Sequence, residues 1–330
     1  MKVLVTGASG FVGRGLLPRL AAGGHGGVAV GREPPRDLPA GWTAATRPQV
    51  LAREPAGAID AIVHLEVKQH VPRPKPADID AFETVNVGGT CEWLEWAERY
   101  RVETFVHLST IKAVMAGEGP TYEDAPAEAL SPYGSSKARA EAAVRRWAGS
   151  DVSHQAVILR PTPVYGPGNE ANLAAFVQQI LGGRPCLIGA GDTRKSIVSR
   201  TNLVAAIEFA IANAEPGCTA YTVADPNTPT LAELASLIAD LGGVVPPRRI
   251  PAVAAAAVAK IGDVIEYLTR RSFPLTSSRL NAIRETTLFP CDKIVAAGFR
   301  HPQTTREGLA EMVAWAQSHP GGSRQIRMST

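Results

Sequence analysis

Cysteine is scarce in this sequence of 330 residues, and its few cysteines lie far apart, at Cys91, Cys186, Cys218 and Cys291. No two of them form a Cys-x-x-Cys pair. Disulfide scaffolds and cysteine-ligated zinc sites depend on close spacing, so neither is expected. The histidines likewise form no His-x-x-His or His-Glu-x-x-His pair, and no metal site is expected. This composition suits a reducing cytoplasm.

Long apolar runs and clusters of like charge are also rare. The longest wholly apolar stretch, residues 250–259, spans about ten residues, half of what a membrane-spanning helix needs. Basic residues stand singly or in short pairs and the net charge is +3, so neither nucleic acid nor a membrane is an expected partner. The first apolar residues run directly into a glycine motif, which leaves no room for a secretory signal. We therefore expect a cytoplasmic protein.

The remaining composition is that of a soluble globular protein, with 45% hydrophobic and 20% charged residues. Short apolar runs alternate with helical patterns through the first half of the chain. This alternation predicts an α/β fold of the Rossmann type, a doubly wound parallel sheet with helices on both faces. The predicted strands are residues 3–5, 28–30, 61–65, 105–108 and 156–159. The predicted helices between them include 14–22, 79–99 and 132–148.

The pattern also predicts two domains. Residues 1–166 form the expected dinucleotide-binding domain, which residues 197–224 rejoin with a helix and a strand. Residues 167–196 and 225–330 are expected to form a smaller, mostly helical substrate-binding lobe. Doubly wound sheets bind ligands at the carboxyl ends of their strands, where we expect that lobe to lie.

A glycine motif follows the first strand directly and opens the first helix. It reads Thr6-Gly7-Ala8-Ser9-Gly10-Phe11-Val12-Gly13. Gly7 permits a tight turn, Gly10 lets the backbone approach a pyrophosphate, and Gly13 allows close packing of helix on strand. The free N–H groups of the helix N-terminus favour bound phosphate. The order of strand, glycines and helix therefore predicts dinucleotide binding, against the alternative of a glycine-rich turn without ligand.

The residue after the second strand helps to choose the cofactor. A carboxylate there binds the ribose of NAD, whereas a cation accommodates the 2′-phosphate of NADP. This chain has Arg32 at that place, and an arginine fork suits a phosphate. Either NADP or NAD is expected, with NADP favoured by Arg32 over the alternative of a solvated loop arginine.

A Tyr-x-x-x-Lys pair, Tyr133 and Lys137, lies in a predicted helix that Ser131 can cap. Its spacing places both side chains on one helix face. A phenol whose pKa is lowered by a neighbouring ammonium can accept the proton of a carbinol hydroxyl during hydride transfer. Ser109 and Thr110, at the end of the fourth strand, are the candidates for polarising the substrate oxygen. The competing reading is an exposed helical Tyr–Lys pair.

These motifs resemble the extended short-chain dehydrogenase/reductase superfamily, in its NAD-dependent epimerase/dehydratase branch. The run Phe-Val-His-Leu-Ser-Thr at 105–110 resembles that branch's strand, and the match gives Thr110 the catalytic hydroxyl and Ser109 a supporting position. Asn86 begins a stretch similar to the family's Asn-Val-x-Gly-Thr. The run at 159–168 resembles its Leu-Arg-Pro-x-x-Val-Tyr-Gly-Pro-Gly, in which Pro161 and Val164 line the nicotinamide side.

The resemblance extends to substrate residues and also has departures. Asn172 and Leu173 resemble a pair that contacts a sugar-nucleotide diphosphate, and Arg194 lies in a basic stretch that suits the same group. The third strand ends in His-Leu-Glu-Val where the family has His-Leu-Ala-Ala, which places Glu66 near the nicotinamide ribose. The expected cofactor-binding set is Gly7, Ser9, Gly10, Phe11, Val12, Gly13, Arg32, Leu65, Glu66, Asn86, Tyr133, Lys137, Pro161 and Val164.

The resemblance implies an enzyme acting on a nucleotide-diphosphate sugar. An NAD(P)-dependent epimerase with a Tyr-Lys-Thr site is the first hypothesis, and an NADPH-dependent keto-sugar reductase is the second. A 4,6-dehydratase is disfavoured because Ile111 and Lys112, rather than Asp-Glu, follow Thr110. A reductase of apolar alcohols and a non-catalytic cofactor sensor stay as further alternatives. The resemblance also implies a homodimer joined through helices near 90–100 and 138–147, with Trp93, Trp96 and Trp147 on the shared surface.

Overall fold

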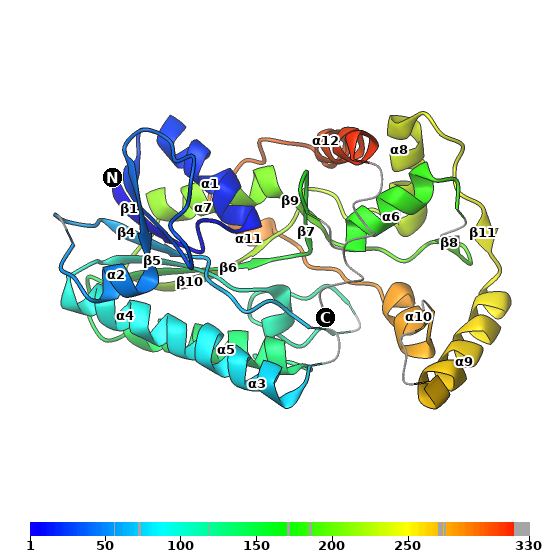
Figure 1. Ribbon diagram of the computed structural model, residues 1–330, viewed down its shortest axis with the longest axis horizontal. Coiled ribbons are helices and arrows are strands. Elements are labelled where there is room, and N and C mark those ends of the chain that lie inside the picture. The colour runs from blue at the N-terminus through cyan, green and yellow to red at the C-terminus, as the bar shows by residue number, and fades with distance from the viewer. Residues whose placement is uncertain are drawn as a thin grey trace. The chain divides into compact units, whose positions relative to one another are not determined.

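The computed structural model describes residues 1–55, 57–71, 74–117, 119–169, 172–184, 187–269, 273 and 275–319 (Figure 1). The chain divides into two compact units. Unit 1 comprises Met1–Val164, Val198–Asp225 and Phe289–Pro302, and unit 2 comprises Tyr165–Ile197, Pro226–Leu288 and Gln303–Thr330. Each unit has its own hydrophobic core.

Unit 1 is built on a seven-stranded sheet in the order β10-β6-β5-β4-β1-β2-β3, and every pairing in it is parallel. The predicted Rossmann-type fold is therefore confirmed. All strands point their carboxyl ends toward one edge, which is where such sheets bind ligands. The strands are β1 (Lys2–Thr6), β2 (Gly26–Gly31), β3 (Trp42–Thr46), β4 (Ala61–His64), β5 (Thr104–Leu108), β6 (Gln155–Pro161) and β10 (Gly217–Val223).

Helices cover both faces of this sheet because its strands are apolar on both sides. Val3 and Val5 of β1 face a core shared with helices α1 and α7, while Leu4 faces a core shared with α4 and α5. The helical elements of unit 1 are α1 (Phe11–Ala22), α2 (Arg47–Leu51), α3 (Pro76–Phe82), the π-helix η1 (Glu83–Gly88), α4 (Gly89–Arg99), the 3-10 helix η2 (Ile111–Ala113), α5 (Pro132–Ala148), α7 (Arg200–Ala212) and α11 (Asp292–Ala296).

The three tryptophans expected on a dimer surface lie inside unit 1 instead. Trp93, Trp96 and Trp147 are buried and pack with Phe105 and Val144 in the core beneath α4 and α5. The family resemblance led us to expect these large side chains on a shared helix surface, and that placement is wrong. They face the sheet because burying large aromatic rings against apolar strands removes the most surface from water.

A segment near the C-terminal end also belongs to unit 1, whereas the sequence pattern grouped it with the substrate-binding lobe. Cys291, Ile294 and Phe299 pack into the same core as α7. The ammonium of Lys293 donates a hydrogen bond to the carbonyl of Ala220 in β10 at 3.0 Å. These contacts place Phe289–Pro302 against the edge of the large sheet.

Unit 2 has a core of three helices, α6 (Asn172–Leu181), α8 (Leu231–Gly242) and α12 (Thr305–Ser318). A second, smaller cluster joins α9 (Ala252–Thr269) and α10 (Ser277–Arg284) to a two-stranded sheet of β8 (Leu187–Ile188) and β11 (Arg249–Ile250). Two further short strands, β7 (Val164–Tyr165) and β9 (Val198–Ser199), complete the fold. Within the described ranges, no helix is both long and apolar enough to cross a membrane.

Candidate active site

The glycine turn after β1 is fixed by its contact with the end of β4. Gly7 has a φ of +64°, and a Cβ on it would lie 2.8 Å from the carbonyl oxygen of Leu65. Any other residue would be strained both by its backbone conformation and by this contact. Gly13 is equally constrained, since its Cβ would lie 2.5 Å from the carbonyl oxygen of Ala8. The turn therefore requires glycine at both positions.

The N-terminus of α1 has the properties of an anion site. Its N-cap, Gly10, offers no side-chain hydrogen bond to the first turn, and that turn contains no acidic residue. Ser9 and Gly10 are exposed, and the backbone N–H groups of Phe11 and Val12 begin the helix. Unsatisfied N–H groups and the positive end of the helix dipole suit a pyrophosphate. The residues present thus fit a dinucleotide cofactor.

Two arginines lie near this turn. Arg32 is exposed and directly follows Gly31, the last residue of β2. A Cβ on Gly31 would lie 3.1 Å from the hydroxyl oxygen of Ser9, so the end of β2 adjoins the turn. The second cation was not predicted: the guanidinium of Arg200 lies 4.8 Å from the centre of the Phe11 ring.

A hydroxyl and an imidazole hold the strand ends together. The Thr6 hydroxyl accepts hydrogen bonds from the N–H groups of Leu65 at 3.1 Å and Glu66 at 3.2 Å, and lies 2.9 Å from Nδ1 of His64. His64 Nε2 lies 3.2 Å from the Thr90 hydroxyl. Burial, with smaller effects of Lys137 and Arg47, holds the pKa of His64 well below its usual value. A neutral imidazole that accepts from Thr6 and donates to Thr90 satisfies every one of these contacts.

The carboxylate of Glu66 is bound by two donors within unit 1. Arg47 Nη1 donates to it at 3.2 Å, and the indole N–H of Trp93 donates at 3.3 Å. Arg47 also reaches Glu92 at 2.5 Å. The backbone of Glu66 is the part of this residue nearest the glycine turn, because a Cβ on Gly7 would lie 2.9 Å from its nitrogen.

Tyr133 and Lys137 lie one turn apart in α5, which begins as the sequence predicts. The Ser131 hydroxyl accepts the N–H of Gly134 at 3.1 Å, and Pro132 is the first helical residue. The Tyr133 ring packs edge-on against Phe82 and His70, with ring centres 5.8 Å apart in both pairs. Burial raises the pKa of Tyr133 to about 12, the opposite direction to the acidification expected from Lys137.

The ammonium of Lys137 is anchored at the end of β5. Its Nζ atom donates to the carbonyl of Leu108 at 2.8 Å and lies 3.2 Å from Nε2 of His107. The side chain is buried, and burial lowers the pKa of Lys137 to about 8 while the charge of Glu141 opposes that shift. Burial thus brings the pKa of Lys137 close to neutral pH.

Ser109 and Thr110 have different environments although they are neighbours. The Ser109 hydroxyl donates to Glu141 at 2.5 Å, and Arg160 binds the same carboxylate through Nε at 3.0 Å and Nη2 at 2.7 Å. All three side chains are buried. Thr110 is half-buried, and its hydroxyl caps η2 by accepting the N–H of Lys112 at 3.3 Å. Ser109 therefore belongs to a buried ion-pair network, and Thr110 has the more accessible hydroxyl.

Asn86 connects the segment after β4 to the catalytic helix. Its side chain accepts the N–H of Lys68 at 2.8 Å and donates to the carbonyl of Lys68 at 3.3 Å. It also donates to the Ser136 hydroxyl at 2.9 Å, which in turn donates to the carbonyl of Tyr133 at 2.8 Å. Asn86 lies within the π-helix η1 and is buried. Its hydrogen bonds thus connect the backbone of Lys68 to the backbone of α5 at Tyr133.

The other predicted residues are distributed over both units. Pro161 is buried at the end of β6, and half-buried Val164 packs against the core of unit 1. In unit 2, Leu173 packs against the helical core, and Arg194 donates to the carbonyl of Thr228 at 2.7 Å. The side chain of Asn172 lies outside the described residues. None of the unit 2 predictions is tested by these contacts.

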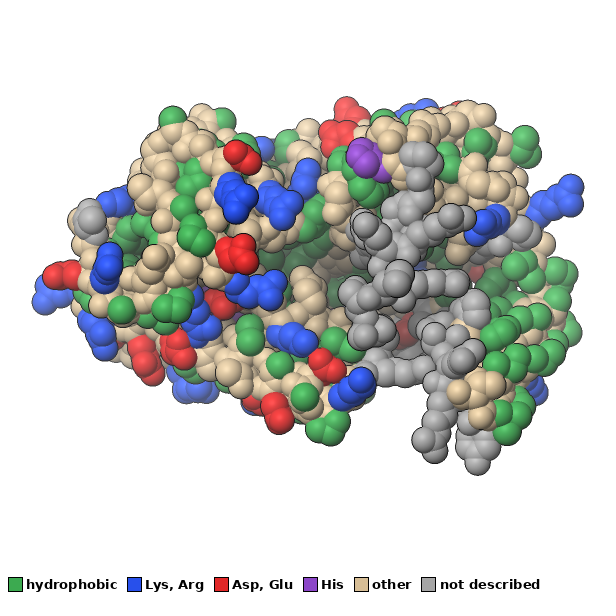
Figure 2. Space-filling view, in the orientation of Figure 1, with side chains coloured by type: hydrophobic (Ala, Val, Ile, Leu, Met, Phe, Trp, Pro, Cys, Tyr) green, Lys and Arg blue, Asp and Glu red, His purple; other side chains and the backbone are tan. Residues whose placement is uncertain are grey.

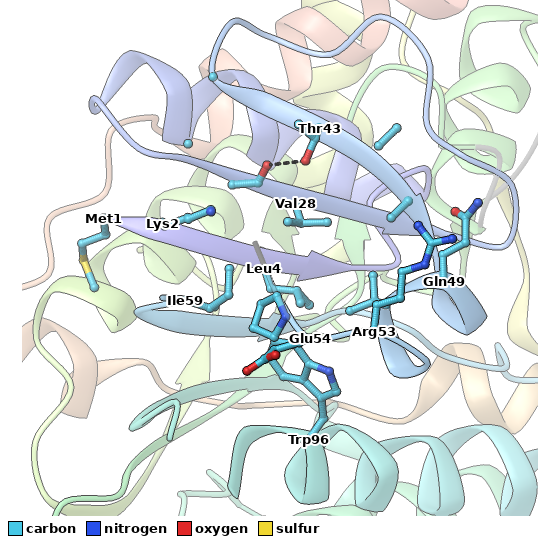
Figure 3. Close-up of a pocket in the computed structure, with 17 residues that line it drawn as sticks. Met1, Lys2, Leu4, Val28, Thr43, Gln49, Arg53, Glu54, Ile59 and Trp96 are labelled. Carbon is cyan, nitrogen blue, oxygen red and sulfur yellow. Dashed lines mark hydrogen bonds between the residues drawn. The ribbon is translucent and has the colours of Figure 1, made fainter. Parts of the chain in front are cut away.

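A cavity of about 660 Å³ opens at another place in unit 1 (Figure 3). Side chains of Leu4, Val28, Ile59 and Trp96 contribute to its walls, and Thr43 donates to the carbonyl of Gly27 at 3.3 Å beside it. None of the predicted site residues lines this cavity. Across the described ranges, no group of His, Cys, Asp or Glu side chains could hold a metal ion.

The chain belongs to the NAD dependent epimerase/dehydratase family, whose model matches residues 3–224. It is 26% identical over 320 residues to N-acetyl-alpha-D-glucosaminyl-diphospho-ditrans,octacis-undecaprenol 4-epimerase of Escherichia coli O157:H7, covering 96% of each chain. A solved structure of MoeE5 in complex with UDP-glucose and NAD has a TM-score of 0.72 at 24% identity, covering 97% of this chain and 99% of that one.

A human relative in fold carries the other form of the cofactor. The solved structure of human epimerase family protein SDR39U1 with NADPH has a TM-score of 0.74 at 18% identity and covers 96% of this chain and 99% of that chain. Family membership therefore makes this chain an NAD(P)-dependent epimerase/dehydratase-type enzyme. It does not decide between the two cofactors.

Proposed function

We propose that this enzyme is an epimerase that inverts a carbinol carbon of a sugar linked to a diphosphate, in the first instance a nucleotide sugar. The anchoring of Lys137 at the end of β5 carries the proposal. It holds a buried ammonium one helical turn from Tyr133, and the carboxyl end of β5 lies at the same sheet edge as the glycine turn after β1. Hydride and proton transfer at one carbon needs this combination of phenol, cation and cofactor site.

Each side chain has a definite role in this proposal. A bound nicotinamide cofactor supplies the acceptor and donor of hydride. Tyr133 takes the proton of the sugar hydroxyl and later returns it, and Thr110 donates a hydrogen bond to the same oxygen. Because burial alone raises the pKa of Tyr133 to about 12, the phenol needs added positive charge to act near neutral pH. Lys137 supplies part of that charge when protonated.

The cofactor is proposed to be NADP rather than NAD because of Arg32. This exposed side chain follows β2 at the place where a 2′-phosphate would lie. Replacing it (Arg32→Ser) removes one charge-assisted contact and should weaken NADPH binding about tenfold or more, with little effect on NADH. Fluorescence titration with both nucleotides measures the ratio of the NADPH and NADH affinities. A ratio that Arg32→Ser leaves unchanged would show that Arg32 does not contact the 2′-phosphate.

A keto-sugar reductase of the same fold is the alternative reaction. The identity of the cofactor that stays with the enzyme separates the two. Purified protein is denatured and any released nucleotide is identified by chromatography and mass spectrometry. Stoichiometric oxidised cofactor supports the epimerase, since a redox-neutral cycle regenerates it, whereas an empty site that consumes added NADPH supports the reductase.

The key test of the active site is Tyr133→Phe. This variant keeps the ring contacts with Phe82 and His70 and loses only the hydroxyl. Turnover of a nucleotide sugar should fall about 10²-fold or more, with cofactor affinity unchanged. Arg146→Lys, on the exposed side of the same helix, is the matched control and should keep full activity. Full activity of Tyr133→Phe would remove the proposed base.

A sugar carried on a polyprenyl diphosphate is the second candidate substrate. The Escherichia coli relative is named for a sugar on an undecaprenyl diphosphate, and it matches this chain over nearly its whole length. Nucleotide sugars and such lipid-linked sugars share the sugar diphosphate, so the same active-site chemistry serves both.

We also propose a cytoplasmic homodimer with unit 2 as the substrate-binding part. Sedimentation velocity at micromolar concentration tests the dimer.

A further inference from the structure

Helix α9 places small residues on its inner side and large apolar residues on its outer side, the reverse of an ordinary surface helix. Its inner side carries Ala255, Ala259 and Gly262, all buried. A Cβ on Gly262 would lie 2.2 Å from the carbonyl oxygen of Leu275, so the helix packs closely against the neighbouring segment. A surface helix normally places its large apolar residues on that inner side.

The outer side of α9 carries the large apolar residues instead. Val253 is 83% exposed, Ile261 and Val264 are each 57% exposed, and Leu268 is 72% exposed. Val258 is also exposed, at 43%. At about 100° per residue these side chains fall within an arc of about 140° along the whole helix. Figure 2 shows hydrophobic side chains gathered over this helix.

A helix with apolar residues on both its inner and its outer side usually has both sides covered. Isolated exposed apolar residues are common on soluble proteins, but a continuous stripe over the 18 residues of α9 is not. The helix cannot span a bilayer, and the described chain offers no other span. Its one-sided apolar exposure corresponds to a helix that lies in the plane of a membrane surface.

The charges around the stripe favour a lipid surface over another protein. Lys260 is exposed and lies beside the stripe, one helical turn from Val264. Arg248 and Arg249 are exposed immediately before the helix. The acidic side chains of the helix lie outside the arc of the stripe: Asp263 accepts the N–H of Ser277 at 3.0 Å and Glu266 accepts that of Phe273 at 2.7 Å. Basic residues beside an apolar face are typical of binding to anionic headgroups.

We propose that the outer face of α9 docks on an anionic lipid bilayer. Val253, Val258, Ile261, Val264 and Leu268 enter the headgroup–acyl boundary, and Lys260, Arg248 and Arg249 contact phosphate. The sequence predicts no membrane partner, because it has neither a spanning segment nor a dense basic cluster, but a helix that lies at the interface does not need a spanning segment. Docking of α9 on the bilayer does not depend on turnover by the enzyme. If the second candidate substrate of the proposed function is right, docking brings the enzyme to its lipid-linked sugar.

Vesicle sedimentation tests the proposal directly. The full chain is mixed with vesicles of phosphatidylethanolamine and phosphatidylglycerol and the bound fraction is measured. The variant Ile261→Gln/Val264→Gln should bind at least about tenfold more weakly, because two aliphatic side chains that enter the lipid are lost. The matched control Ile79→Gln/Val152→Gln removes the same two exposed residue types from unit 1 and should bind as the unaltered chain does.

Further measurements distinguish lipid binding from the alternative explanations. Hydrogen exchange of the unaltered chain should slow in residues 252–269 when vesicles are added, which requires no variant to fold. Unaltered protein that stays in the supernatant, or an α9 variant that binds as well as the control, overturns the proposal. The proposal is also overturned if the unaltered chain is a dimer in vesicle-free solution and the α9 variant is a monomer. That result would show that a second copy of the chain covers the outer face of α9. Turnover of a soluble nucleotide sugar, assayed separately, reports only on the proposed function.

Discussion

The ammonium nitrogen of Lys137 lies 3.2 Å from Nε2 of His107, and the two side chains are almost completely buried. An ammonium has only donors, so Nε2 must present its lone pair and the ring must be neutral. Burial and the charge of Lys137 accordingly hold the pKa of His107 well below its usual value. The proton then sits on Nδ1, which has no hydrogen-bond partner among the described residues. His107 thus leaves Nδ1 without a hydrogen bond while Nε2 faces the ammonium of Lys137.

Lys137 should make stability rise with pH in a defined window. Its pKa is about 8 in the folded protein and about 10.4 when unfolded, so between these values the unfolded chain binds more protons. The free energy of unfolding should therefore rise by about 2.5 kcal/mol from pH 8 to 10.4 through this group. Urea denaturation across this range should show the rise, and Lys137→Met should lack it. An equal rise in the variant would contradict the assignment.

His107 should act through Lys137 rather than on substrate. His107→Phe keeps a ring in the stack with His64 but removes the acceptor for the ammonium. Turnover should fall about tenfold, the value of one charge-assisted hydrogen bond, and the stability window of Lys137 should move to lower pH. His107→Gln retains an acceptor and should recover most of both properties. A purely structural role would lower stability without moving the window.

Removing the charge of Glu141 should be among the costliest changes in unit 1. Glu141→Gln leaves the buried guanidinium of Arg160 without its carboxylate, at a cost of about 3–5 kcal/mol in the free energy of unfolding. The double variant Glu141→Leu/Arg160→Met removes both charges and should lose less than either single change. Chemical denaturation of the unaltered chain, Glu141→Leu, Arg160→Met and the double variant measures the coupling. Additive losses would show that the pair is not coupled.

Gly134 should not tolerate even a methyl group. Glycine to alanine within a helix ordinarily stabilises by about 1 kcal/mol, but here the Cβ would lie 2.2 Å from the carbonyl oxygen of Lys112. We expect Gly134→Ala to lower stability by about 1–3 kcal/mol and to reduce activity, because α5 must move away from η2. Gly117→Ala, with nothing within 4 Å of its Cβ, is the matched control for thermal unfolding.

The sequence predicted the parts of the site that depend on local spacing. The glycine turn, the cap at Ser131 and the Tyr-x-x-x-Lys pair in α5 require only neighbouring residues, and the structure contains the turn and the helix start as expected. The Rossmann-type sheet followed from apolar periodicity. Roles of individual site residues stay predictions, because no bound ligand tests them.

Long-range pairing was beyond the sequence pattern. The partnership of Ser109 with Glu141 and Arg160 joins β5, α5 and β6, and no spacing rule links them. A charged residue in the middle of an apolar helix face was the only available signal for Glu141. Helical spacing also could not tell that the tryptophans of α4 and α5 face the sheet. The arrangement of α9, with small residues inside and large apolar ones outside, was likewise not predicted, because an Ala-rich stretch does not show which side of the helix faces the protein.

The hydrogen bonds of Asn86 have a consequence for how inactive variants would be interpreted. Its amide holds both backbone groups of Lys68 and, through Ser136, the backbone of Tyr133. A substitution at position 86 would therefore disturb the phenol without touching it. A random mutagenesis screen for loss of turnover would be expected to return position 86 alongside Tyr133 and Lys137. A comparison of cofactor affinity with turnover rate would separate an effect of Asn86 on the phenol from an effect on cofactor binding.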